Sequence, residues 1–194
     1  MKLSKVQDNI MILVALQQAI QKYTSELVKI QDSKEKVTKS AYSSMILIMV
    51  NSYLAEWDLL EINLKNDKGM LKVRKCTTPA LKEIRKWKGL QYYRNCYLAH
   101  SPRNKAKSNV LLEDTTSLNI PQSIPDMALL AGLLYCSNKI LITQFSEDFD
   151  ITIKAIKSHR IPTNKNGIKT LKEADEKLSV ISKQITELIK TYNV

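Results

Sequence analysis

The chain has 194 residues, and a hydrophobic share of 44% is enough for a buried core, which excludes a wholly disordered protein. Four glycines and five prolines leave few tight turns and favour helices over short connected strands. The net charge of +11, from 30 Lys and Arg against 19 Asp and Glu, excludes an acidic protein and favours a polyanionic partner, nucleic acid before an anionic membrane surface.

Apolar residues recur at spacings of three and four in five segments, and this periodicity predicts five helices. They span approximately residues 4–30, 33 or 36 to 64, 77 or 78 to 100, 126–158 and 169–192. The turn formers Asn66-Asp67-Lys68-Gly69 end the second helix. Thr77 or Thr78 is expected to cap the third, with Pro79 in its first turn.

We therefore predict an all-α protein, a bundle of about five long antiparallel helices in a single domain over residues 1–194. The apolar faces of such long helices are wider than one neighbour can cover, which favours a homodimer. Residues 101–125 form the longest irregular stretch. No membrane association is expected, because the apolar run at residues 45–50 is too short to span a bilayer.

The cysteines suggest where the protein works. Cys76, Cys96 and Cys136 lie far apart and form no C-x-x-C pair, so a zinc ribbon or thioredoxin-like site is not expected. An odd number of unpaired cysteines is typical of a reducing compartment, and we expect a cytoplasmic protein with no bound metal or cofactor.

The most informative segment is Tyr93-Arg94-Asn95-Cys96-Tyr97-Leu98-Ala99-His100-Ser101-Pro102-Arg103. Ser101-Pro102 disfavours further helix, so His100 is expected at a helix end. There the helix dipole favours a protonated imidazole, whereas neighbouring cations oppose it.

Arg94 and His100 suit chemistry at a phosphodiester. An arginine can grip a phosphate and stabilise developing charge, and a histidine near neutrality can move protons to and from a ribose hydroxyl. On one helix the two lie about 9 Å apart along the axis and roughly 120° apart around it, so a cleft between two copies would bring them together better. No carboxylate cluster with metal-ligand spacing lies nearby, which favours a mechanism without metal.

These residues resemble the R-x(4–6)-H motif of the HEPN superfamily, with Asn95 as the polar residue after the arginine. The similarity extends to Ser52-Tyr53-Leu54-Ala55-Glu56-Trp57 and to Trp87-x-x-Leu90, and covers about residues 40–105. It implies a homodimer with a composite cleft that cleaves RNA without metal through the ribose 2′-hydroxyl. It also implies an acidic or polar residue near the arginine, for which Glu56 is the first candidate and Asp58 the second.

Neighbouring residues are candidates for RNA contact. Tyr93 and Tyr97 could stack on bases, although tyrosines at this spacing more often pack in a core or a dimer contact. Arg103 and Lys105 could contact phosphate, or could belong to a solvated loop.

This resemblance therefore implies an endoribonuclease of the toxin or phage-defence type, with RNA and a second copy as partners and an antitoxin protein by family analogy. Two alternatives remain. A helical dimer could bind RNA, a nucleotide or a protein without cutting, or the chain could be purely structural, with His100 capping its helix and Arg94 paired with Glu56.

Overall fold

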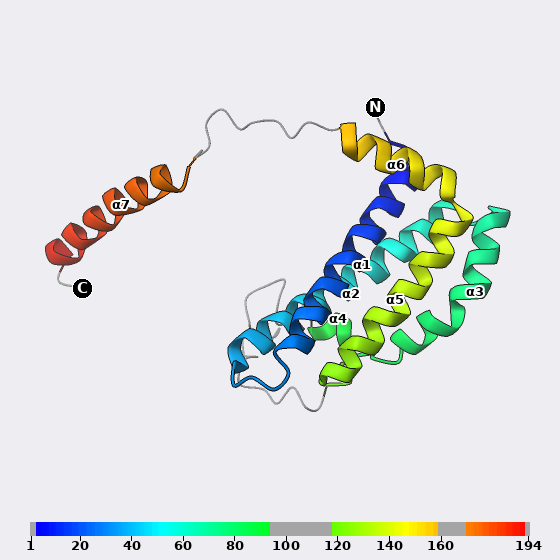
Figure 1. The fold of residues 1–194 in the computed structure, drawn as a ribbon, viewed down its shortest axis with the longest axis horizontal. Coiled ribbons are helices and arrows are strands. Elements are labelled where there is room, and N and C mark those ends of the chain that lie inside the picture. The colour runs from blue at the N-terminus through cyan, green and yellow to red at the C-terminus, as the bar shows by residue number, and fades with distance from the viewer. Residues whose placement is uncertain (1–2, 94–117, 159–169, 193–194) are drawn as a thin grey trace. The chain divides into compact units, whose positions relative to one another are not determined.

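The computed structural model describes residues 3–93, 118–158 and 170–192, and every regular element in these ranges is a helix (Figure 1). Seven helices occur there: α1 (Lys5–Lys29), α2 (Lys36–Asn63), α3 (Lys68–Ile84), α4 (Leu90–Tyr93), α5 (Ile124–Gln144), α6 (Ser146–Ser158) and α7 (Leu171–Tyr192). The prediction of an all-α protein is confirmed.

The chain divides into two compact units, Met1–Ser158 and His159–Val194. In the first unit α1 packs on α2, α5 and α6, while α3 packs on α5 and the short α4 packs on α2 (Figure 1). The second unit contains α7 and is treated by itself. The five-helix bundle, the single domain over residues 1–194 and the homodimer remain predictions.

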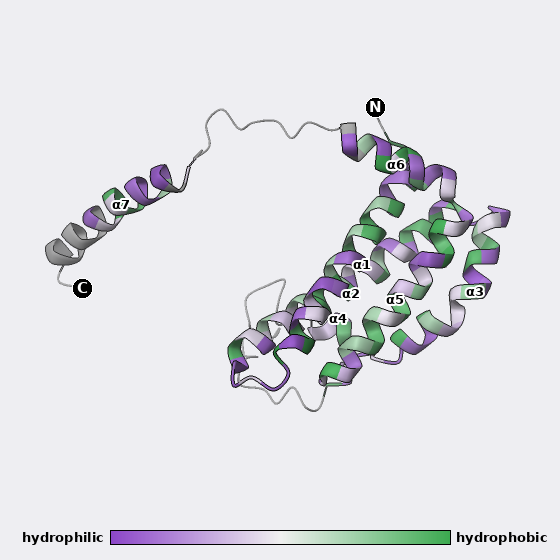
Figure 2. Cartoon of the chain, in the orientation of Figure 1, coloured by the Kyte–Doolittle hydropathy of each residue, from purple (hydrophilic) through white to green (hydrophobic). Residues whose placement is uncertain are grey.

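The core of the first unit lies among α1, α2, α3 and α5 and consists mainly of aliphatic side chains. Its largest fully buried members are Trp57, Tyr53, Ile10, Leu13, Ile20, Leu27, Ile46, Leu60, Met70, Ile84, Met127 and Leu130. Hydrophobic residues dominate α5 (Figure 2), which is long and apolar enough to cross a membrane by length and composition alone. Core helices of globular proteins have the same character, and α5 packs on α1 and α3.

Polar groups inside this core are paired across three helices. The Tyr53 hydroxyl on α2 donates to Asn138 Oδ1 on α5 at 2.7 Å, and Asn138 Nδ2 donates to the Leu13 carbonyl of α1 at 3.1 Å. Burial raises the pKa of Tyr53, so the phenol stays protonated and remains a donor. Because a buried polar group without a partner is costly, these bonds define how α1, α2 and α5 are aligned.

The third predicted helix, from Thr77 or Thr78 to about residue 100, was wrong at its start and is not continuous, and its predicted end lies outside the described residues. Asp67 caps α3 by accepting from the Met70 N–H at 2.8 Å, so the helix starts well before Thr77. Thr77 and Thr78 instead lie inside the helix, ahead of Pro79, and their hydroxyls donate to the carbonyls of Val73 and Arg74, four residues back.

The same helix also ends early, at Ile84, and α4 begins only at Leu90. The Gly89 N–H donates to the Asn119 carbonyl at 2.9 Å, and Asn119 Nδ2 donates to the Lys86 carbonyl at 3.0 Å. A Cβ on Gly89 would lie 3.0 Å from the Asn119 carbonyl oxygen, so a larger residue would crowd this contact. The break therefore depends on a segment distant in sequence.

The fourth predicted helix is two helices. Ser123 caps α5 in a reciprocal capping box with Asp126, so the helix starts at Ile124, slightly before the predicted start. It ends at Gln144, where Phe145 leaves helical geometry and packs against the core, and α6 begins at Ser146. Burial alone would raise the pKa of Asp126, but hydrogen bonds from Ser123 and from the Gln122 N–H outweigh it and lower that pKa.

Candidate nucleic-acid interface

The short helix α4 is fixed to α2 just before the Arg94 segment. Asn51 of α2 donates from Nδ2 to the Leu90 carbonyl at 2.9 Å and to its own helix at the Leu47 carbonyl at 3.0 Å. Farther along, the Tyr93 hydroxyl lies 3.2 Å from the Ser44 hydroxyl. The residue that precedes Arg94 is therefore held on α2 at a defined place.

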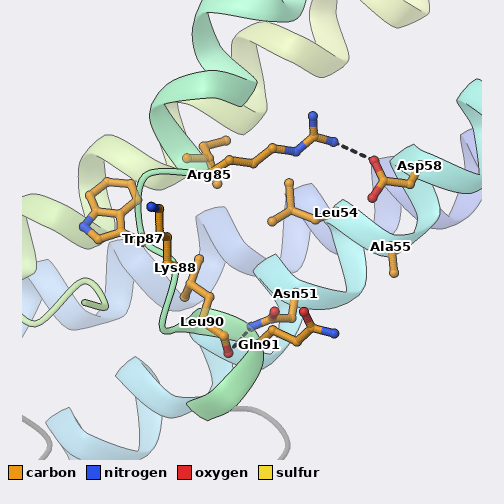
Figure 3. A pocket seen from close by; sticks show the side chains of 10 residues that line it. Asn51, Leu54, Ala55, Asp58, Arg85, Trp87, Lys88, Leu90 and Gln91 are labelled. Carbon is orange, nitrogen blue, oxygen red and sulfur yellow. Dashed lines mark hydrogen bonds and ion pairs between the residues drawn. The ribbon is translucent and has the colours of Figure 1, made fainter. Parts of the chain in front are cut away.

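A groove of about 260 Å³ lies beside α4, between α2 and the segment that follows α3 (Figure 3). Its α2 side presents Asn51, Leu54, Ala55 and Asp58. Its other side presents Ile84, Arg85, Trp87, Lys88, Leu90 and Gln91. Apolar side chains, an aromatic ring, amides and two cations together suit a ligand with both a flat ring and a negative charge.

The Asp58–Arg85 ion pair crosses the rim of this groove (Figure 3). The two side chains are 58% and 47% exposed, so water screens the pair and it contributes little to stability. An incoming phosphate can compete for the guanidinium, because Arg85 gives up only a solvated partner. A smaller hollow of about 230 Å³ is also lined by Arg85, together with Arg74, Lys82 and Glu61, which pairs with Arg74.

Positive charge is concentrated in the chain that leads to this groove. Residues 68–88 hold eight lysines and arginines and one acidic residue, a net charge of +7 out of +11. Four lysines of α3 lie within a narrow arc of an ideal helix and span about 21 Å of its length. They are the exposed residues Lys68, Lys72, Lys75 and Lys82. Such a row matches the electrostatic footprint of a nucleic-acid backbone.

Glu56, the first candidate for positioning Arg94, contacts α1. Asn9 Nδ2 donates to Glu56 Oε2 at 2.8 Å, and Asn63 Nδ2 donates to Asn9 Oδ1 at 2.9 Å. Glu56 lies about 140° around α2 from Asn51, whereas Asp58 lies only about 20° from it. Asp58, the second candidate, is therefore the acidic residue that lines the groove.

Tyr93 is half-buried and packs against the core, as the packing alternative expects. Its ring also lines a second groove of about 380 Å³ with Lys39, Ser43 and Ser44. Contact between Tyr93 and RNA remains a prediction. Among the residues that the structure describes, no group of three or more His, Cys, Asp or Glu could hold a metal, and Cys76 and Cys136 are free and exposed.

The remaining predicted site residues lie outside the described residues. They are Arg94, Asn95, Tyr97, His100, Arg103 and Lys105. Their roles, and the distance from Glu56 or Asp58 to Arg94, stay predictions. What the structure supplies is the groove and the cation row on the chain that precedes them.

Sequence reasoning missed the lysine row and the groove residues Arg85, Lys88 and Gln91. The charge count could have revealed the row, because residues 68–88 contain one acid among eight cations. It was hidden by the expectation that a new helix starts at Thr77 or Thr78, which split the row between a turn and a helix. The groove itself needs tertiary contacts and has no comparable signal.

No protein-family model, curated protein or solved structure matches this chain.

Proposed function

We propose that this chain is a metal-independent endoribonuclease of the toxin or phage-defence type, with an active site that two copies share. The observation that carries the proposal is the sequence Arg94-Asn95, followed by His100 ahead of Ser101-Pro102. Its support is the setting: the segment begins where α4 is fixed to α2, beside a groove with Arg85 and Lys88 on its wall.

The proposed reaction follows from these residue types. Arg94 holds the scissile phosphate and stabilises the charge that builds on it. His100 takes the proton of the ribose 2′-hydroxyl as that oxygen attacks phosphorus, and the resulting imidazolium gives a proton to the departing 5′-oxygen. Cleavage leaves a 2′,3′-cyclic phosphate and a 5′-hydroxyl. Asn95 would position the reacting groups, and Glu56 stays a candidate for positioning Arg94.

The test is RNA cleavage in EDTA by the purified full chain. We expect cyclic-phosphate products from the wild type and a loss of at least about 100-fold in rate for His100→Ala and for Arg94→Ala. His159→Ala is the matched control, because these are the only two histidines in the sequence. Wild-type protein without activity on any RNA pool would refute the nuclease, and undiminished cleavage by His100→Ala would refute the proposed active site.

A second function, binding of RNA without cleavage, is favoured by the cation row on α3. A binder would show affinity that falls steeply with salt and no product. Replacing Lys72 and Lys75 with Gln should then reduce the slope of log affinity against log salt by about 2, one for each lost phosphate contact. Lys177 and Lys183 of α7 are the control pair, because α7 carries equal numbers of cations and acids.

A further inference from the structure

Helix α7 carries apolar residues at a strict alternation of three and four residues along its whole length. They are Leu171, Ala174, Leu178, Ile181, Ile185, Leu188 and Tyr192. This is the heptad spacing of a coiled coil, sustained for three heptads. Figure 2 shows apolar residues between hydrophilic ones along the described part of the helix.

The apolar stripe is narrow. The positions that flank it are polar except for Ile189: Asp175, Lys177, Ser182, Gln184 and Thr191. A helix that packs on a globular core needs a wider stripe, as α1 has, where the neighbours Asn9 and Ile10 and then Leu13 and Val14 are all buried. A two-position seam fits the side of a single partner helix.

Two seam residues are exposed within the unit that contains α7. Leu178 is 66% exposed and Ile181 is 42% exposed, although both are large aliphatic side chains. Burial against a partner would remove this apolar surface from water, and that transfer is favourable in proportion to the area buried.

Charge indicates what kind of partner fits. Helix α7 holds four lysines and four acidic residues, so its net charge is zero, whereas residues 68–88 carry +7. A neutral helix has no electrostatic attraction to nucleic acid or to an anionic membrane. Copies of a chain with net charge +11 repel one another, and a neutral helix is the segment where they meet with least opposition.

We propose that α7 pairs with α7 of a second copy of this chain through the heptad seam. The occupant is a second copy because the seam is apolar and its helix has no net charge, so two copies meet there without the like-charge repulsion that the rest of a chain of net charge +11 imposes. The pairing is independent of the nuclease proposal. It gives the chain a dimerisation element separate from the Arg94 segment, and it would hold two copies together whether or not they share an active site.

The test is the mass of the full chain in solution, measured by sedimentation equilibrium over a range of concentrations. Wild-type protein is expected at twice the monomer mass of 22.2 kDa at the higher concentrations. Leu178→Glu and Ile181→Glu place a charge in the seam and should raise the dissociation constant at least about tenfold. Glutamate forms helices better than isoleucine, so melting of α7 would not explain that result.

Val180→Glu is the matched control. Val180 is 56% exposed and equally apolar, but it lies off the seam on the same turn, so the dimer should persist. Ile181→Leu keeps the seam apolar and should also stay dimeric. Circular dichroism checks that every variant keeps its helix content.

Two outcomes would overturn the proposal. One is a wild-type chain that stays at 22.2 kDa at every concentration, as expected if α7 folds onto its own chain. The other is a dimer that Leu178→Glu and Ile181→Glu leave unchanged, as expected if another surface joins the copies. Neither readout depends on RNA cleavage, so the nuclease can fail while α7 pairing stands, and the reverse.

Discussion

The two sides of α2 use similar residues for different purposes. On the side toward α1 and α5, Tyr53 and Glu56 bond to asparagines of neighbouring helices. On the side toward α4, Asp58 meets Arg85 across an exposed rim and Asn51 holds Leu90. Tyr53 is fully buried and Glu56 is half-buried, and both have partners on other helices, whereas Asp58 and Arg85 are exposed at the rim of a groove.

The difference shows that chemical type does not tell a structural residue from a binding residue. Glu56 and Asp58 are two residues apart on one helix, and only the partner each meets separates them. Enclosed polar groups raise the cost of rearrangement, because a lost bond leaves a buried group unsatisfied. Exposed pairs cost little to break, so a ligand can replace one partner. Substitutions on the two sides should therefore have different readouts.

The two tryptophans give the largest contrast. Trp57 is fully buried on the core side, and Trp57→Ala should lower the free energy of unfolding by about 3–5 kcal/mol. Trp87 lines the groove and is only half-buried, so Trp87→Ala should cost less than half as much while weakening RNA binding. Urea unfolding measures the first effect and RNA titration the second. Equal losses of stability would contradict the division of α2 into two sides.

Tyr53→Phe tests the enclosed polar network by removing one hydroxyl. Asn138 Oδ1 then loses its donor in the core, and we expect a loss of about 1–3 kcal/mol in unfolding free energy. Tyr42→Phe, at a half-buried tyrosine on the same helix, is the control and should change stability by less. If both variants unfold alike, the buried hydrogen bond contributes nothing.

Glu56→Gln and Asp58→Asn compare the two acids directly. Glu56→Gln exchanges a charged acceptor for a neutral one opposite Asn9, and should cost about 1 kcal/mol. Asp58→Asn should cost less than that, yet it releases Arg85 and should strengthen RNA binding. Chemical unfolding and RNA titration of both variants provide the measurements. A cleavage rate that falls with Glu56→Gln at unchanged stability would instead support Glu56 as the residue that positions Arg94.

The smallest expected effect is at Asp126. This residue lies in the first turn of α5, away from both sides of α2, and tests the electrostatic effect of a single capping carboxylate. The pKa of Asp126 is lowered in the folded protein. Its carboxylate therefore stabilises the fold fully above the pKa of the unfolded state, and this stabilisation is lost as the pH falls through the pKa of the folded state. Asp126→Asn should remove that acid-range dependence and cost about 0.5–1 kcal/mol near neutral pH, as loss of a helix cap does. Unfolding at pH 7 and pH 3 gives the comparison. Equal pH dependence in both proteins would show that Asp126 does not report on the cap.

Local pattern was sufficient for α1, α2 and α7. Their bounds follow from apolar spacing and from turn formers that lie next to them in the chain, such as Ser4 at the start of α1. The same information failed at Gly89 and Phe145, where helices end because a distant segment or the core takes the backbone or side chain. The spacing of apolar residues continues through such breaks. The sequence therefore predicted one helix where the structure has the end of α3 followed by α4, and one helix where it has α5 followed by α6.

The sequence by itself therefore determined the helical class, the basic charge and the order of Arg94, Asn95 and His100 ahead of Ser101-Pro102, because each of these depends on residue identity and near neighbours. It also determined that Glu56 and Asp58 cannot share a face of α2. Only the tertiary structure decided which of the two faces the groove, because that depends on α1 covering one side and α4 the other. The groove beside α4 is likewise tertiary, because residues from 51 to 58 and from 84 to 91 form it together.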